Sequence, residues 1–395
     1  VGNEIAKELQ RLQDDLPPFD MIIAKNSIKA EIGKEKFGLI KDLSEPIAAA
    51  SIAQVHFAKI EGKNYAIKIL RPNIEKRFNE ELEALMLFAS IVEAILPKTR
   101  RLKLIEVVHL LKEITAIEMD LRFEGSAASE LKKNTISDPN FIVPKINWDF
   151  TSKRILTSEK VEGISIKDIS KIEAQKIDKK QLAKNIIQNF LRQAVGDGFF
   201  HGDMHQGNLF VDKNGNIIPV DFGIMGRLDV NNRKYLAEIL YGFIKRDYDK
   251  VADVHFIAGL VPPDQSKESF SQALRSIGEP IFGQSIKNIS AGKLLAQLFE
   301  ITEKFNMTTQ PQLLLLQKTM VVVEGVARTL DEDANIWEIS KPVLEGWLKQ
   351  KVGPEAKFKQ AINTTSKVID RLPEIPGMMD KASKILELLA VGSVT

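Results

Sequence analysis

The spacing of apolar and polar residues changes from helical to strand-like early in the chain. Apolar residues recur at helical spacing over residues 5–12 and 21–33, and the prolines at 17 and 18 separate these stretches. The residues that follow alternate as they do in strands. The predicted strands are 37–43, 53–60 and 64–70, with a loop of small residues at 46–51 and a tight turn at 61–63. This order is typical of a hairpin that covers phosphate groups.

Helical spacing dominates the rest of the chain. Further segments are predicted as helices 73–96, 104–131 and 181–198, strands 141–143, 154–157, 208–211 and 217–220, and a linker at 158–163. From Asn231 onward the pattern is helix upon helix. The order predicts an α+β fold with two lobes and a cleft between them. The predicted parts are an N-terminal helical extension (1–35), a small mixed β/α N-lobe with inserted helices (36–160) and a mostly helical C-lobe (161–395).

Composition and charge exclude several classes of function. The chain has 395 residues, of which 44% are hydrophobic and 27% charged, so we expect a packed, folded protein. Fifty-five Lys and Arg oppose 53 Asp and Glu, which gives no electrostatic argument for a nucleic-acid partner. Because there are no cysteines, disulfides, thiolate metal sites and a cysteine nucleophile are excluded.

The sequence contains no uninterrupted apolar run of the roughly 18 residues that a membrane-spanning helix needs. The nearest run, 313–326, is broken by four polar residues, and we predict a buried core helix there. The weakly amphipathic tail 378–394 is predicted to be a docked C-terminal helix. The chain begins at Val1 without the pattern of a signal peptide, so we expect that its natural N-terminus is missing.

The strongest chemical signal is the segment 201–208 followed by an Asp-Phe-Gly triplet at 221–223. The first segment carries Asp203 and, five positions later, Asn208; Asp221 follows 13 positions after Asn208. Catalytic loops of kinases carry an Asp and an Asn at this spacing, and a metal-binding Asp-Phe-Gly comes after them. The strands between them predict a β-hairpin that presents Asn208 and Asp221 side by side.

These residue types suit the transfer of a phosphoryl group. Magnesium prefers hard oxygen ligands, and Asn208 and Asp221 are the candidate ligands. Asp203 is the candidate catalytic base, which orients and deprotonates an acceptor hydroxyl. The alternative is a helix-capping Asp, a turn Asn and an ordinary hairpin turn, but the joint spacing favours the catalytic interpretation. The five histidines are too scattered to predict a zinc site.

Lys68 lies at the end of the predicted hairpin and matches the strand lysine that contacts the α- and β-phosphates of a nucleotide. A lone strand lysine more often points to solvent, so its position in the hairpin carries the prediction. The small-residue loop contains four candidate nucleotide-binding residues, Ala48, Ala49, Ala50 and Ser51. Alanine methyl groups restrict the close backbone approach that glycines permit, so we expect a stiffer phosphate loop. An ordinary strand bend is the alternative.

Lys68 needs an acidic partner, and the predicted helix over 104–131 offers Glu118, Asp120 and Glu124. At about 100° per residue, Asp120 and Glu124 share one helix face and Glu118 points elsewhere. A solvated acidic stretch remains the alternative on spacing alone.

Together these motifs resemble the UbiB-like atypical kinases, also called the ADCK family. The resemblance rests on the alanine-rich segment 48–56, Lys68, the acidic residues 118–124, the loop 201–208 and the triplet 221–223, and it spans most of the chain. It implies a protein-kinase-like fold with an extra N-terminal helical element over the active site. Residues 1–19 resemble the segment that follows the family's KxGQ motif, but the motif itself is absent here. The family's C-terminal membrane helices are also absent.

The resemblance also assigns roles to residues. It makes Glu124 the partner of Lys68 and gives Glu118 and Asp120 a regulatory role. Glu159 and Val161, in the linker, join the candidate nucleotide-binding residues. ATP and Mg²⁺ are the implied cofactors, and ATP or ADP, lipids or prenylated quinone precursors, and ubiquinone-biosynthesis enzymes are the implied partners. The implied location is the cytoplasm, peripheral to the inner membrane.

Two departures from ordinary protein kinases bear on the substrate. Position 202 is Gly, so the arginine that links the catalytic loop to a phosphorylated activation loop is missing, and no Ala-Pro-Glu follows Asp221. We therefore expect a small-molecule, lipid or self-directed activity in ubiquinone biosynthesis. The alternatives are a small-molecule kinase of the aminoglycoside or choline type and a nucleotide-sensing scaffold of a biosynthetic complex. No dinucleotide fingerprint or iron-ligand cluster supports a quinone-ring hydroxylase.

Overall fold

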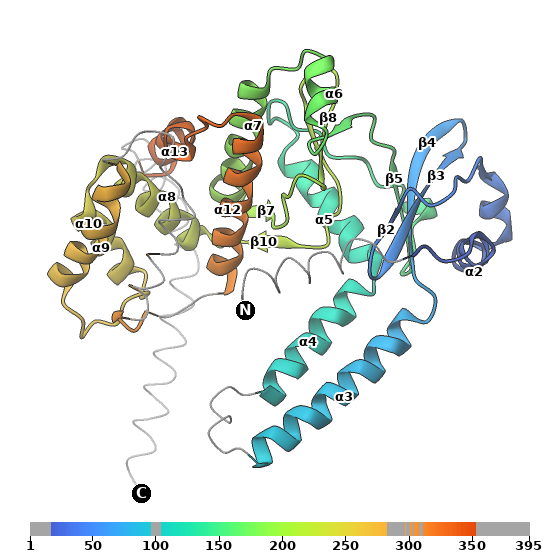
Figure 1. Cartoon of the computed structure of the whole chain (residues 1–395), viewed down its shortest axis with the longest axis horizontal. Coiled ribbons are helices and arrows are strands. Elements are labelled where there is room, and N and C mark those ends of the chain that lie inside the picture. The colour runs from blue at the N-terminus through green and yellow to red at the C-terminus, as the bar shows by residue number, and fades with distance from the viewer. Residues whose placement is uncertain are drawn as a thin grey trace, which may run out of the picture.

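The computed structural model describes residues 17–95, 104–282, 297, 301, 304–307 and 311–352. These residues form a sheet-containing lobe and a mostly helical lobe, as predicted (Figure 1). The first lobe contains α2 (Met21–Leu39), β1 (Ile40–Lys41), β2 (Ala48–Ala49), β3 (Ala53–Ile60), β4 (Lys63–Leu70), α3 (Ile74–Ile95), α4 (Leu104–Glu118), α5 (Leu121–Asn134) and β5 (Ile155–Glu159). The predicted helices 5–12 and 378–394 and the basic residues 98–101 lie outside the described residues.

The sheet of the first lobe is antiparallel, with the order β1-β3-β4-β5, and β2 pairs with β3. β3 and β4 are joined at Glu61 and Gly62, which both have positive φ, as a tight hairpin turn of matching twist requires. Because strand side chains alternate between faces, Ile67 and Ile69 point to the face covered by α2 and Lys68 points to the other face. The alternation of β4 thus directs Lys68 toward α5.

The second lobe is built around a buried helix. Its elements are β6 (Ile164–Ser165), α6 (Ile169–Ala174), α7 (Lys179–Leu191), a π-helical turn (Arg192–Asp197), β7 (Phe199–His201), β8 (Leu209–Val211), β9 (Ile217–Pro219), β10 (Met225–Arg227), α8 (Val230–Lys245), α9 (Tyr248–Ile257), α10 (Lys267–Phe282), α12 (Pro311–Leu330) and α13 (Ile336–Val352). α7 lies against α12 and α13, and most of its side chains are buried. Its Phe190 meets Phe200 of β7 edge to face, with ring centroids 5.8 Å apart. This contact fixes the strand that leads into the segment 201–208.

Most predicted elements are confirmed, including the hairpin of β8 and β9 and a buried helix over 313–326, which is part of α12. Four details are wrong. The predicted strand 37–43 is a strand only at Ile40–Lys41, because α2 continues past a kink at Gly33. The predicted helix 104–131 is interrupted at 119–120, and residues 141–143 form an isolated bridge instead of a strand. The predicted loop 46–51 contains the short strand β2.

One helix contacts both lobes through its charged side chains. α5 carries Glu124 near its start and Glu130 six residues later. Glu130 accepts two hydrogen bonds from the guanidinium group of Arg227 on β10, at 2.9 and 2.8 Å. This second ion pair is exposed to solvent, unlike Glu124.

The helices α3 and α4 form a hairpin that projects from the sheet (Figure 1). Leu82 and Ala89 of α3 pack against Val108 of α4 and form a small core of their own. The outer surface of the hairpin carries many exposed apolar side chains: Leu85, Leu87, Phe88, Ile91, Ile95, Val107, Leu111 and Ile117. Among the described residues, no helix is both long enough and apolar enough to cross a membrane.

Acid should destabilise the fold through its buried histidines. Burial lowers the pKa of His255 to about 4, whereas an unfolded histidine titrates near 6.5. Below pH 6.5 the unfolded chain therefore binds a proton at this histidine that the folded chain does not bind. The contribution of neutral His255 to the free energy of unfolding is complete above pH 6.5 and is lost as the pH falls toward 4. The loss from His255 alone is about 3 kcal/mol at pH 4. Urea unfolding at pH 7.5 and 4.5 should show it.

A comparison of two variants isolates this effect. The difference in unfolding free energy between the two pH values should shrink in His255→Gln and stay at the wild-type value in His109→Gln, since His109 is exposed on α4. An equal pH dependence in all three proteins would contradict the assignment.

Candidate active site

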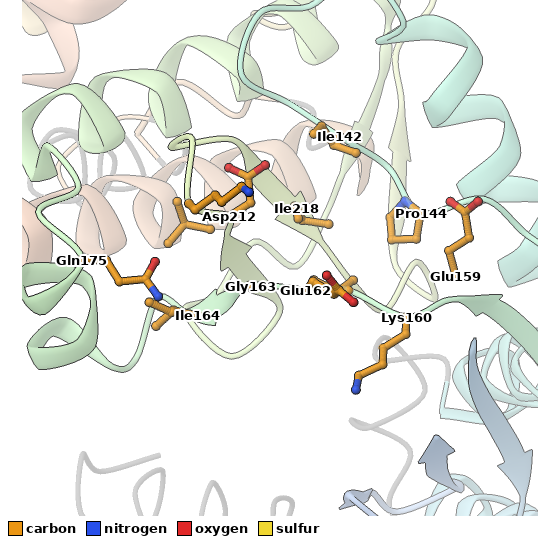
Figure 2. Close-up of a pocket in the computed structure, with 13 residues that line it drawn as sticks. Ile142, Pro144, Glu159, Lys160, Glu162, Gly163, Ile164, Gln175, Asp212 and Ile218 are labelled. Atoms are coloured by element: carbon orange, nitrogen blue, oxygen red, sulfur yellow. The ribbon is translucent and has the colours of Figure 1, made fainter. Parts of the chain in front are cut away.

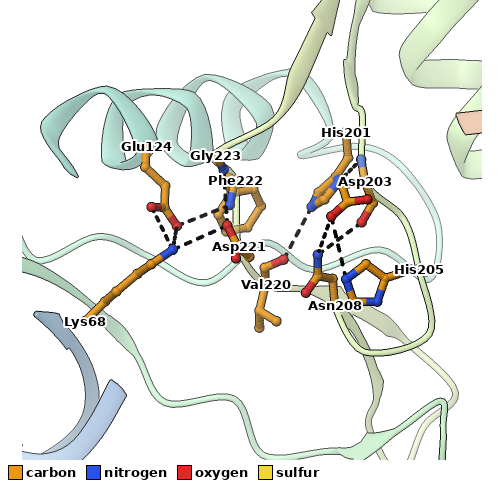
Figure 3. Close-up of polar contacts among 10 residues, drawn as sticks. All are labelled: Lys68, Glu124, His201, Asp203, His205, Asn208, Val220, Asp221, Phe222 and Gly223. Atoms are coloured by element: carbon orange, nitrogen blue, oxygen red, sulfur yellow. Dashed lines mark hydrogen bonds and ion pairs between the residues drawn. The ribbon is translucent and has the colours of Figure 1, made fainter. Parts of the chain in front are cut away.

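Three charged side chains connect the two lobes (Figure 3). The ammonium group of Lys68 donates to both carboxylate oxygens of Glu124, at 2.9 Å each. The same group lies 3.3 Å from Oδ1 of Asp221. Burial opposes the charge of Lys68, but the two carboxylates outweigh burial and raise its pKa. Lys68 also lowers the pKa of Asp221, so this carboxylate is ionised in the physiological range. The structure thus brings the three predicted residues together.

Asp120 fixes the start of the helix that carries Glu124. It is the N-cap of α5, and its carboxylate accepts the backbone N–H of Arg122 at 3.1 Å. The guanidinium group of Arg122 donates to the same carboxylate at 2.9 and 2.6 Å. An N-cap satisfies backbone donors that the first helical turn leaves open. Asp120 therefore acts on Lys68 through the position of Glu124, and not from a shared helix face.

Glu118, at the end of α4, is exposed but remains within electrostatic reach of the same group. Partial desolvation and the charge of Asp221 raise the pKa of Glu118, and Lys68 opposes them. Among the described residues, Glu118 makes no direct contact with Lys68 or Asp221 that would show its regulatory role, which therefore stays a prediction.

The loop between β7 and β8 holds Asp203 and Asn208 against each other (Figure 3). The amide nitrogen of Asn208 donates to the backbone oxygen of Asp203 at 3.1 Å and to its Oδ2 at 3.3 Å. Nε2 of His205 lies 3.6 Å from the same Oδ2. One face of the Asp203 carboxylate is therefore fixed by the loop itself, and its side chain is only partly exposed.

The hairpin of β8 and β9 places Asp221 beside this loop. The backbone N–H of Val220 donates to the carbonyl of Asn208 at 2.8 Å, so the two ends of the hairpin are adjacent, as predicted. Asp221 adopts a left-handed backbone conformation, with φ of 62°, that non-glycine residues seldom use. Such strain persists where the surroundings hold a residue in place, and here it turns the carboxylate back toward Lys68.

His201 joins the two segments, a role that the sequence analysis missed. The N–H of Asp203 donates to its Nδ1 at 3.1 Å, so Nε2 carries the proton and faces the carbonyl of Val220 at 3.3 Å. Burial lowers the pKa of His201, which favours this neutral form. The ring also lies 5.7 Å from that of Phe222. The available signal was the place of His201 two residues before Asp203.

The oxygen ligands at this site fit a magnesium ion. Asp221 offers an ionised carboxylate, and the amide nitrogen of Asn208 faces Asp203, which turns the amide oxygen the other way. In the part of the chain that the structure describes, no group of three or more His, Cys, Asp or Glu side chains could hold a metal ion. Magnesium needs few protein ligands because it keeps waters and binds phosphate oxygens.

The alanine-rich loop lies on the same sheet as Lys68. The strand register pairs Ala48 with Val55 and Val55 with Lys68, so the three residues form one row across the sheet. Opposed residues of an antiparallel pair point to the same face, and neighbouring strands lie about 4.8 Å apart. Ala48 is therefore roughly 10 Å from Lys68 on the face that Lys68 uses. Ala49 completes β2, and Ala50 is held by the guanidinium group of Arg71, which donates to its carbonyl at 2.9 Å.

Glu159 and Val161 lie apart from the charged group. Both line a pocket of about 540 Å³ between the β5–β6 linker and the tip of the β8–β9 hairpin (Figure 2). The side chain of Glu159 accepts the N–H of Lys145 at 3.0 Å. Neither Lys68 nor Asp221 lines this pocket. A nucleotide role for Glu159 and Val161 therefore stays a prediction.

Two sequence profiles match most of the chain. Residues 11–255 match the ABC1 atypical kinase-like domain, and residues 274–335 match the UbiB helical domain. The first match includes Lys68, Glu124, the loop 201–208 and Asp221. The second includes all of α12.

Curated relatives show the same similarity. The chain is 37% identical over 388 residues to "Probable protein kinase UbiB" of Marinobacter nauticus, covering 97% of this chain and 71% of the relative. It is 39% identical over 382 residues to the protein of the same name from Vibrio atlanticus, covering 95% and 70%. Among solved structures, Mycobacterium tuberculosis Rv3197, determined with erythromycin, is similar with a TM-score of 0.62, 20% identity and 83% coverage of each chain. This last likeness concerns the fold alone.

Proposed function

Because the chain belongs to the ABC1 atypical kinase-like family, within its UbiB group, we propose that it binds magnesium–ATP and transfers or hydrolyses the γ-phosphoryl group in support of ubiquinone biosynthesis. The family makes it an ATP-dependent phosphotransferase of the atypical kinase class. The family match also favours this function over a small-molecule kinase of the aminoglycoside or choline type.

The observation that carries the proposal is the charged chain from Glu124 through Lys68 to Asp221. It holds a permanent cation where phosphates need one and a carboxylate beside it. When bound, magnesium would neutralise the phosphate charge, with Asp221 and Asn208 as its protein ligands. Asp203 would accept the proton of the attacking hydroxyl or water while Asn208 fixes its orientation.

The class of phosphoryl acceptor is inferred from residues that the catalytic loop and the segment after it lack. Gly202 provides no arginine for a phosphorylated activation segment, and α8 begins only seven residues after Gly223. We infer an acceptor that is a lipid, a prenylated quinone precursor, the protein itself or water. Phosphorylation of a broad panel of generic protein substrates would contradict this inference.

The first test uses the wild-type chain. Its melting temperature is measured with ATP, with ADP and without nucleotide, each with and without magnesium, and release of phosphate is followed in parallel. At 100 times its dissociation constant, a ligand of the folded state adds about 2.7 kcal/mol, which is visible as a higher melting temperature. Binding with turnover supports the proposal. Binding without any turnover would favour a nucleotide-sensing scaffold, and no binding would contradict the kinase function.

Peripheral contact with a membrane is a second part of the proposal, and the α3–α4 hairpin supports it. Leu87, Ile91 and Ile95 follow one another at four-residue intervals along the exposed side of α3. The eight connecting residues 96–103 contain four Lys or Arg and no acidic residue. An apolar helix face next to a basic segment suits the interface of an anionic bilayer.

Flotation with vesicles of phosphatidylglycerol and phosphatidylethanolamine tests this surface. Replacing Leu87, Ile91 and Ile95 together with serine should lower the bound fraction, with a partition coefficient reduced about a hundredfold or more, because each apolar side chain adds over 1 kcal/mol when buried. A matched control replaces three exposed apolar residues elsewhere, Ile136, Val230 and Ile257, and should float like the wild type. Equal binding by both triple variants, or equal binding to neutral phosphatidylcholine, would reject the surface.

A further inference from the structure

The helix α12 contacts the catalytic loop directly. The hydroxyl of Thr319, in the middle of α12, lies 2.9 Å from the carbonyl oxygen of Gly202 and donates to it. Both residues are buried, and Thr319 is fully so. Gly202 immediately precedes Asp203, so the hydrogen bond holds the peptide unit that leads into the candidate base.

Gly202 leaves the space that this contact needs. A Cβ atom at position 202 would lie 3.0 Å from Cγ2 of Ile224, 3.1 Å from the carbonyl oxygen of Ile224 and 3.2 Å from Cδ2 of Leu315 on α12. These approaches are tighter than ordinary van der Waals contact. The absence of a side chain at 202 therefore lets α12 lie against the loop.

The same face of α12 also reaches the segment of the metal ligand. Ile224 follows the Asp-Phe-Gly triplet, and its carbonyl accepts the N–H of Gly202 at 2.8 Å. β7 and β10 continue this pairing, with His201 opposite Met225. α12 thus lies against β10, which follows the Asp-Phe-Gly triplet, and bonds to Gly202, which follows β7 (Figure 1).

We propose that α12 positions Asp203 through the hydrogen bond from Thr319 to Gly202, in place of the arginine clamp that Gly202 cannot form. Thr319 is then a positioning residue, and the helical region sets the rate of the phosphoryl step. The hydroxyl carries one proton and also lies 2.8 Å from the carbonyl of Leu315, one turn earlier. A shift of α12 can therefore return this proton to the helix's own carbonyl without unfolding the helix. The proposal rests on the proposed ATP-dependent activity.

The test compares three variants of the full chain. Thr319→Val keeps the shape of the side chain and removes the donor, and should lower kcat for ATP turnover about tenfold, because it leaves a buried carbonyl without its partner. The KM for ATP and the melting-temperature rise with magnesium–ATP should stay at wild-type values. Thr319→Ser restores the hydroxyl and should recover most of kcat. Thr329→Val is the control, since the Thr329 hydroxyl donates to Val326 in its own helix.

Amide hydrogen exchange separates failure of this proposal from failure of the proposed function. In Thr319→Val, exchange over residues 199–206 should accelerate on the order of tenfold, whether or not ATP is turned over. An unchanged kcat, a loss of kcat that Thr329→Val shares, or an unchanged exchange rate would each overturn the positioning role. If the wild type neither binds nor hydrolyses ATP but Thr319→Val still exchanges faster than the wild type, the kinase function is rejected and the role of the contact is retained.

Discussion

Replacing Asp203 with asparagine should lower ATP turnover about a thousandfold while the thermal shift with magnesium–ATP persists. Asparagine has the size of aspartate but cannot accept a proton at neutral pH. The loop itself should survive, because Asn208 also donates to the backbone oxygen of residue 203 at 3.1 Å. Steady-state release of phosphate measures turnover, and the thermal shift measures nucleotide binding, both at saturating ATP.

The matched control for Asp203 is Asp42→Asn. Asp42 is exposed, follows β1, pairs with Lys59 of β3 and has a positive φ that asparagine tolerates. This variant should turn over ATP at the wild-type rate. A fall of less than about threefold in Asp203→Asn would mean that another group accepts the proton and would remove Asp203 from the mechanism.

Replacing Asp221 with asparagine should abolish the part of nucleotide binding that depends on magnesium. The variant keeps the left-handed backbone but loses the charge that a hard cation requires and that Lys68 faces at 3.3 Å. The magnesium-dependent stabilisation by ATP is about 2.7 kcal/mol for the wild type at 100 times the dissociation constant. The rise in melting temperature that reports it should disappear in the variant, and turnover should fall with it.

The pH dependence of this binding provides an independent check on Asp221. Because Lys68 lowers its pKa, the carboxylate is ionised well below neutral pH. Its contribution to magnesium binding should therefore not change between pH 6 and 8. A magnesium-dependent shift of wild-type size in Asp221→Asn would place the metal elsewhere and contradict the site.

The pairing of Lys68 with Glu124 could be predicted from the sequence only through the resemblance. The two residues are 56 positions apart, and a helical hairpin of two long helices separates them. The alternation along β4 fixes which face Lys68 uses, but no local pattern states which helix lies opposite that face. By contrast, Asn208 and Asp221 are joined by a short hairpin, and their proximity follows from strand and turn signals alone.

The break between α4 and α5 shows why local periodicity fails near the site. Apolar spacing continues across residues 119 and 120, and the pattern therefore predicts one helix. The carboxylate of Asp120 instead caps a new helix and competes with continuation of the old one. The contact of Thr319 with Gly202 was equally out of reach, because it joins residues 117 positions apart through side-chain packing.

The two ends of α5 differ in how strongly dissolved ions can influence them. The pair of Glu124 with Lys68 is buried and little screened, whereas the pair of Glu130 with Arg227 is open to solvent and is worth under about 1 kcal/mol. Added salt should therefore weaken the Glu130–Arg227 pair and leave the Glu124–Lys68 pair intact, while the buried side chains of α5 stay in the core that it shares with the helical lobe. Ionic strength thus acts on one end of this helix as a tunable surface contact and leaves undisturbed the end that holds the lysine facing the nucleotide.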